Sequence, residues 1–163
     1  MAIPNPAKDR LDQIDSVLDE YENNLGLAPY TADFHDQSVK KYMGMPRQHM
    51  EKLTVEECAE AALLLGGFSF YLQRSYNREM ARVNWATSSL KKTVSGREGQ
   101  YSGSWDSQYY QAIKGDDYTS KLDTIQRYAQ QRADRLTYLA TSVKNLSDLF
   151  VNLQRAKVAR KYE

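Results

Sequence analysis

The sequence is poor in the residues that mark disulfide frameworks, disordered chains and metal sites. It has one cysteine, four prolines, eight glycines and two histidines among 163 residues. A single cysteine cannot form a disulfide within the chain, which is typical of a reducing compartment, and so few prolines and glycines argue against a disordered or fibrous protein. No apolar run is long enough to cross a membrane, and residues 1–10 lack the apolar core of a secretory signal. We therefore expect a cytoplasmic protein.

The short motifs of common enzymes are also missing. There is no glycine-rich phosphate loop ending in Lys-Ser or Lys-Thr, no Cys-x-x-Cys and no His-Glu-x-x-His. His35 and His49 have no cysteine or second histidine close by in the sequence, so they do not predict a metal site. Asp116 and Asp117 follow a glycine, and such a pair is more often a turn and helix N-cap than a catalytic pair. We expect a protein that is not an enzyme and needs no cofactor.

What the sequence has instead is a regular apolar stripe near its C-terminus. The stripe recurs in alternating steps of three and four residues, and only its slot at Arg132 is polar. This repeat predicts one long helix over about residues 118–157, with a narrow seam that needs partner helices. The members of the stripe are Leu122, Ile125, Ala129, Leu136, Leu139, Val143, Leu146, Phe150 and Leu153.

A narrow seam of this kind predicts assembly. A second helix of the same chain can cover part of the stripe, and further copies of the chain are the natural partners for the rest. We therefore expect a homo-oligomer in which every member of the stripe except Ala129 contributes to oligomerisation. Arg132 would then set the register or the stoichiometry of the assembly.

An earlier helix is predicted over about residues 7–25. Pro6 lies where a helix begins and Gly26 lies where one ends. The pattern from residue 30 to residue 52 is weak, apart from one or two helical turns over residues 37–43. We interpret this stretch as a linker or an arm.

The next helix is predicted to begin at Thr54. Thr54 and Glu57 have the spacing of a capping box, in which each side chain accepts a hydrogen bond from the other residue's backbone N–H. An apolar stripe then continues to about Ser95-Gly96. Gly66-Gly67 interrupts it and marks either a kink or a point of close helix–helix approach.

Together these elements predict an all-α fold. A loop over residues 95–104 and a short helix around residues 106–113 join the two long helices, which should pack as an antiparallel hairpin. We expect residues 1–53 to form an acidic N-terminal helix with a linker or arm. Residues 54–163 would form a hairpin domain that assembles through coiled-coil-like packing and binds nucleic acid.

Charge is distributed unevenly along the chain. Residues 1–62 carry 6 Lys and Arg against 12 Asp and Glu, whereas residues 63–163 carry 16 against 9. The basic part could therefore meet a polyanion. Solvated helix faces also carry many charges, so this alternative stays open.

Basic and aromatic residues are clustered around the predicted loop. Arg74, Arg78 and Arg82 step by four and so form one ridge along a helix. Cations that follow a phosphate backbone beside aromatic rings that stack on bases are typical of single-strand binding. The remaining members of the cluster are Lys91, Lys92, Arg97, Tyr101, Trp105, Tyr109 and Tyr110.

Each member of the cluster also has a structural explanation. The three arginines could form a solvated face or pair with acidic residues of a neighbouring subunit. Trp105 could anchor the turn between the helices, and the tyrosines could pack under the loop.

The order of these segments resembles a known family. The UvsY-type recombination mediators of T-even-like phages have a long basic helix, a Tyr-Ser-Gly or Tyr-Thr-Gly loop, a short acidic connection and a long C-terminal helix. The corresponding stretches here are Lys-Lys-Thr-Val-Ser-Gly-Arg-Glu-Gly-Gln-Tyr-Ser-Gly at 91–103, Gly-Asp-Asp-Tyr at 115–118 and Lys-Leu-Asp-Thr at 121–124. The resemblance covers about residues 54–160, and the segment 1–53 has no counterpart in the short family members.

The resemblance implies a specific function. Proteins of this family are not enzymes; they form ring-like oligomers, bind single-stranded DNA and load a RecA-like recombinase onto strands covered by single-strand-binding protein. It implies an all-α oligomer in the host cytoplasm, with Lys91, Lys92, Arg97 and Tyr101 as the first DNA contacts. Further candidate contacts from the basic and aromatic cluster are Arg74, Arg78, Arg82 and Trp105.

Two other functions stay open. The same heptads would suit a phage structural or assembly protein, such as a connector, scaffold or adaptor. A regulator that docks a partner through the acidic residues 9–22 is the third possibility.

Overall fold

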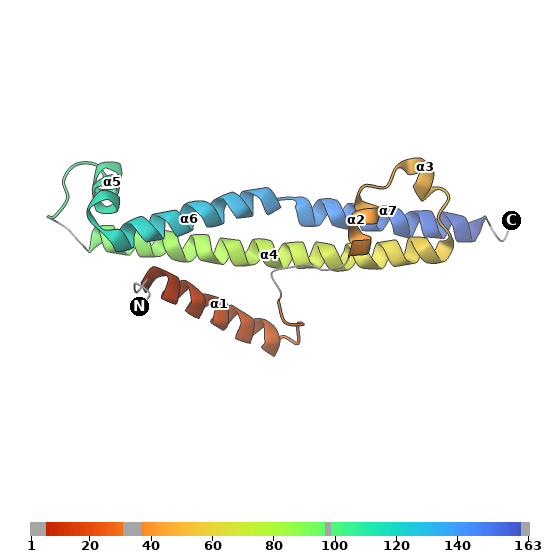
Figure 1. Ribbon diagram of the computed structural model, residues 1–163, viewed down its shortest axis with the longest axis horizontal. Helices are drawn as coiled ribbons and strands as arrows, with labels where there is room; N and C mark the ends of the chain where they lie inside the picture. The colour runs from red at the N-terminus through yellow and green to blue at the C-terminus, as the bar shows by residue number, and fades with distance from the viewer. Residues whose placement is uncertain (1–5, 31–36, 97–98, 161–163) are drawn as a thin grey trace. The chain divides into compact units, whose positions relative to one another are not determined.

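The computed structural model describes residues 6–30, 37–96 and 99–160. Within these ranges every helix or strand element is a helix, joined by turns and loops, and no strand is present, so the all-α fold class is confirmed. Figure 1 shows the helices, which are α1 (Pro6–Asn24), α2 (Gln37–Met43), α3 (Arg47–Met50), α4 (Val55–Ser95), α5 (Trp105–Gly115), α6 (Asp117–Leu136) and α7 (Leu139–Ala159).

The ends of the early helices follow the local signals in the sequence. Helix α1 begins at Pro6, and the chain leaves it at Gly26 with a φ of +78°, a backbone conformation that glycine adopts without strain. The capping box before α4 is formed, because the Thr54 backbone N–H donates to the Glu57 carboxylate at 2.8 Å and the Glu57 N–H donates to the Thr54 hydroxyl at 3.1 Å. The predicted starts of both helices are therefore confirmed.

Asp116 caps a helix, as the sequence predicted. It follows α5, and its Oδ2 accepts a hydrogen bond from the backbone N–H of Thr119 at 2.8 Å at the start of α6. The carboxylate satisfies a backbone donor that has no partner within the helix.

The predicted single helix over residues 118–157 is wrong, because the chain breaks it into α6 and α7. Tyr138 adopts the left-handed conformation, with a φ of 66°, and its carbonyl accepts the first hydrogen bond of α7 from Ser142 at 2.9 Å. A non-glycine residue in this conformation is uncommon. The break leaves the seven-residue spacing intact, since Ala133 and Ala140 are both buried. Apolar periodicity therefore gave no sign of it.

The chain divides into two compact units that are interleaved in the sequence. Unit 1 comprises Met1–Tyr30 and Tyr76–Asp134, and unit 2 comprises Thr31–Ser75 and Arg135–Glu163. Helix α4 thus contributes residues to both. This division differs from the boundary at residue 53 expected from the sequence, because α1 belongs with the second part of α4.

Unit 2 has an apolar core between α2, α7 and the first part of α4. Tyr42 and Phe150 meet edge to face, with ring centroids 5.8 Å apart. The Ser147 hydroxyl donates to the Ala62 carbonyl at 2.7 Å, and a Cβ added at Gly66 would lie 3.7 Å from Ser147 Oγ. Helix α4 continues through Gly66-Gly67, so the predicted interruption is absent. The 3.7 Å at Gly66 is an ordinary van der Waals distance, and a Cβ added at Gly67 would meet no atom within 4 Å, so the packing against α7 does not require glycine at either position.

Unit 1 has a separate core in which α1, α4 and α6 meet. Ala7, Leu90 and Leu122 are buried there. The Gln126 side chain donates to the Thr87 hydroxyl at 3.3 Å, so α6 contacts α4 through polar as well as apolar groups. Together these contacts fix the surface formed by the last turns of α4.

Most of the predicted oligomerisation stripe serves these cores. Leu122, Val143 and Phe150 are buried within their own units. Leu139 is exposed at the start of α7. The remaining members of the stripe, which are half-buried, are Ile125, Leu136, Leu146 and Leu153.

The single cysteine provides a test of the unit 2 core. Cys58 is fully buried on α4, and burial raises the pKa of its thiol above the usual value. Because the thiolate is the reactive form, we expect a disulfide reagent to modify native Cys58 at least about 10-fold more slowly than Cys58 in the denatured chain at pH 8. Equal rates in a colorimetric thiol assay would contradict this packing.

Candidate nucleic-acid interface

An aromatic pocket lies beside the C-terminal turns of α4 in unit 1. It encloses about 230 Å³. Helix α5 supplies the rings and begins at Trp105, because the Ser104 hydroxyl accepts from the Ser107 N–H at 3.4 Å. The residues that line the pocket are Thr87, Leu90, Lys91, Trp105, Asp106, Tyr109, Tyr110 and Gln126.

The rings of this pocket differ in exposure. Trp105 is 45% exposed and Tyr110 is 63% exposed. Tyr109 is half-buried, and its hydroxyl donates to Asp123 on α6 at 2.6 Å. Burial and this hydrogen bond raise the pKa of Tyr109 above its ordinary value, so the hydroxyl stays protonated and holds α5 on α6. Tyr109 is therefore structural, whereas large parts of Trp105 and Tyr110 are exposed to solvent.

The pocket combines three kinds of chemistry that a nucleotide needs. Lys91 is exposed and carries a positive charge that suits a phosphate. Trp105 and Tyr110 offer surfaces on which a base can stack. Asp106 and Gln126 carry oxygens and an amide that can hydrogen-bond the edge of a base.

The other predicted loop contacts lie near this pocket or outside the described residues. Lys92 is exposed in the last turn of α4. Tyr101 is half-buried and does not line the pocket; a Cβ added at Gly115 would lie 3.9 Å from its hydroxyl oxygen. Arg97 lies outside the described residues.

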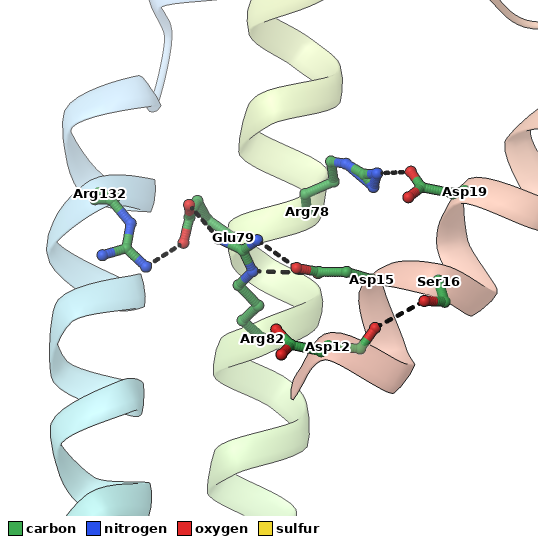
Figure 2. Close-up of polar contacts among 8 residues, drawn as sticks. All are labelled: Asp12, Asp15, Ser16, Asp19, Arg78, Glu79, Arg82 and Arg132. Carbon is green, nitrogen blue, oxygen red and sulfur yellow. Dashed lines mark hydrogen bonds and ion pairs between the residues drawn. The ribbon is translucent and has the colours of Figure 1, made fainter. Parts of the chain in front are cut away.

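Two arginines of the predicted ridge on α4, Arg78 and Arg82, are covered by the acidic helix α1. Figure 2 shows Arg82 with both carboxylate oxygens of Asp15, at 2.6 Å from Nη2 and 3.3 Å from Nε. Nη1 of Arg82 also reaches Glu79 at 3.0 Å. Burial lowers the pKa of Arg82, but the hydrogen bond and charge of Asp15, with the charge of Glu79, raise it above the usual value.

Arg78 is the most enclosed arginine of this cluster. It is only 6% exposed, and its Nη2 forms an ion pair with Asp19 of α1. The centre of its guanidinium lies 4.3 Å from the centroid of the Tyr30 ring, within the range of a cation–π interaction. Its Nη1 is buried and has no hydrogen-bond partner among the described residues.

The three arginines therefore do not form one exposed basic ridge. Arg74 belongs to unit 2, where its guanidinium lies 5.9 Å from the Phe70 ring centroid. Arg78 and Arg82 pair with carboxylates of their own chain, whereas the sequence had left open a solvated face or a neighbouring subunit.

One signal in the sequence could have identified these partners. Asp15 and Asp19 step by four on α1, as Arg78 and Arg82 do on α4. Matching steps of opposite charge allow two helices to pair, although the same spacing also allows other partners.

The polar slot of the C-terminal stripe has an intrachain partner as well. Nη2 of Arg132 on α6 lies 2.9 Å from the Glu79 carboxylate, as Figure 2 shows. Glu79 thus bridges Arg82 and Arg132 and holds α6 against α4. This contact accounts for an arginine in the stripe without a second copy of the chain.

Comparisons with protein-family models, with curated proteins and with solved structures find no match to this chain. Within the part of the chain that the structure describes, no three His, Cys, Asp or Glu side chains gather where they could hold a metal ion. Across the same residues, none of the helices has the length and apolar character needed to span a bilayer. The candidate site therefore rests on its own residues.

Proposed function

We propose that this chain is a non-enzymatic, oligomeric single-stranded DNA-binding protein that helps to load a RecA-like recombinase. The observation that carries the binding part of this proposal is the pocket in which Lys91 lies with Trp105 and Tyr110. A cation beside two exposed rings suits a strand whose bases are unstacked, because a duplex hides its base faces. Lys92, one residue further along α4, extends the positive charge.

The oligomeric part of the proposal rests on exposed apolar side chains and on antiparallel packing. Helix α4 runs antiparallel to α6 within unit 1 and to α7 within unit 2, as expected for parts of a hairpin. In unit 2, Leu63, Phe70 and Leu149 are exposed and could pack against further copies. Several copies would multiply a weak contact by raising its effective concentration.

Recombinase loading rests on the resemblance to the UvsY-type mediators alone. In that mechanism, basic residues of several subunits hold one strand and present it to the recombinase and to single-strand-binding protein. This role consists of binding and presenting a strand, so it needs no catalytic group.

The first test is the affinity for a labelled oligo(dT) strand, measured by fluorescence polarization. We expect the logarithm of the association constant to fall linearly with the logarithm of the salt concentration, because each lysine that binds a phosphate releases a counterion from the DNA. Replacing both Lys91 and Lys92 with alanine should reduce the slope by about 1.4, or about 0.7 for each phosphate contact. A wild-type protein that does not bind at low salt would contradict the proposed function.

A matched double variant separates a local effect from a change in net charge. Lys40 and Lys52 are exposed in unit 2, so K40A/K52A removes the same charge away from the pocket. We expect this variant to keep the wild-type salt slope. Analytical ultracentrifugation of all three proteins, with and without the oligonucleotide, checks that the oligomer is unchanged.

The exposed apolar side chains of unit 2 also favour a second candidate function, that of a phage structural or assembly protein. Leu63 and Phe70 lie seven residues apart on α4, as heptad positions do. A fixed large ring or shell in electron micrographs, together with no affinity for single-stranded DNA, would favour this candidate.

A further inference from the structure

We propose that Arg78 and Arg82 form a second site for the phosphates of the strand, and that helix α1 covers this site with its own carboxylates. The inference rests on the proposed function and extends it, because it gives the acidic N-terminal segment a regulatory role. Helix α1 would act as an internal competitor for the DNA. A bound strand that reaches this site has to displace it.

The contacts of α1 on this site are those that a phosphate group would make. Arg82 binds both oxygens of Asp15 through Nη2 and Nε. A guanidinium recognises a carboxylate and a phosphate in the same forked manner. Asp19 occupies the equivalent position on Arg78, one turn along each helix.

Arg78 also has capacity for a further acceptor. Its Nη1 is buried without a hydrogen-bond partner among the described residues, while Nη2 is used by Asp19. A carboxylate offers two acceptor oxygens, whereas a phosphodiester offers two non-bridging oxygens that share one negative charge and also two ester oxygens. A phosphate at this position could satisfy both nitrogens of the fork.

Helix α1 is held mainly by charge and by few fully buried side chains. Ala7 is the only buried residue of α1, and Val17 and Tyr21 on the same helix are exposed. An open pocket of about 280 Å³ is lined by residues of α1 and by Trp85 of α4, so this part of the contact is not closely packed. A helix with so little buried apolar surface opens at a low free-energy cost.

The charge of α1 matches this role. The helix carries six acidic residues against two basic ones, Lys8 and Arg10. Because α1 is part of the same chain, its effective concentration at the site is high, and a free strand competes only by making several contacts at once. The exposed Lys91 pocket supplies the first of these contacts within the same unit.

The test compares two double variants of α1 in the full-length protein. D15N/D19N removes the carboxylates that pair with the arginines and keeps their shape. D12N/E20Q removes the same charge from exposed positions of the same helix. We expect D15N/D19N to bind labelled oligo(dT) about 10-fold more tightly than D12N/E20Q. Without these carboxylates, the state in which Arg78 and Arg82 are uncovered is no longer a minor one.

The outcomes separate this inference from the proposed function. If wild-type protein binds DNA and both double variants gain equally, the gain comes from net charge and the covered site is refuted. If no variant binds DNA, the proposed function itself fails. Adding R82A to D15N/D19N should abolish the gain, and a gain that persists would also overturn the inference.

A second measurement leaves the carboxylates in place. The chain has two tryptophans, so in the Trp105→Phe variant the only reporter is Trp85, which faces Ile14, Val17 and Leu18 of α1. Saturating oligo(dT) should increase the acrylamide quenching constant of Trp85 as α1 leaves. A constant that is unchanged or lower, with DNA bound, would show that α1 stays in place and would refute displacement.

Discussion

Replacing Phe150 with alanine is expected to lower the free energy of unfolding by about 3–5 kcal/mol. The ring is 1% exposed and packs edge to face on Tyr42 in the core of unit 2. Truncation removes the transfer free energy of the ring and leaves a cavity that the neighbouring helices can fill only in part. Urea denaturation followed by circular dichroism measures the loss.

The adjacent residue provides a matched control. Leu149 lies on the same helix and is 62% exposed, so Leu149→Ala should change the free energy of unfolding by no more than about 0.5 kcal/mol. A loss as large as that of Phe150→Ala would mean that Leu149 is covered in solution. A loss that also depends on protein concentration would identify the cover as a second copy of the chain.

The fold class and most helix ends could be predicted because their causes are local. The capping box of Thr54 and Glu57, the cap at Asp116 and the positive φ at Gly26 each depend on a few neighbouring residues. Such signals lie in the sequence next to the helix ends that they determine. They therefore depend little on tertiary contacts.

The break at Tyr138 could not be predicted from the same information. Apolar periodicity reports which side of a helix is buried, and the buried face keeps its seven-residue spacing from Ala133 to Ala140. A left-handed residue at an exposed position leaves no mark on that pattern. The turn is visible only in the backbone.

The candidate site was predictable in part. Lys91 and Trp105 were expected to act together because both lie close to one loop in the sequence. Asp106 and Gln126 were missed, since Gln126 reaches the pocket from α6 only after the chain has folded. The pairing of Asp15 with Arg82 spans 67 residues, and charge spacing alone allowed other partners for that arginine.

Trp105 is the residue of the pocket whose loss should weaken DNA binding most. Stacking of a base on an aromatic ring contributes about 1–3 kcal/mol, so Trp105→Ala should lower the affinity for oligo(dT) by about 5–150-fold. Trp105→Phe keeps a ring and should lose much less. Tyr128→Ala removes an exposed ring of the same unit that lies outside the pocket, and should bind as the wild type does.

An abasic strand of the same length separates stacking from every other effect of Trp105. It keeps the phosphates that Lys91 and Lys92 would bind, but it offers no base to the ring. We therefore expect Trp105→Ala to leave the affinity for the abasic strand unchanged. The wild type should bind that strand at least as weakly as the variant binds oligo(dT), because an abasic strand also removes stacking on Tyr110. An equal loss on both strands would assign Trp105 to the folding of α5, because a purely structural residue affects phosphate and base contacts alike.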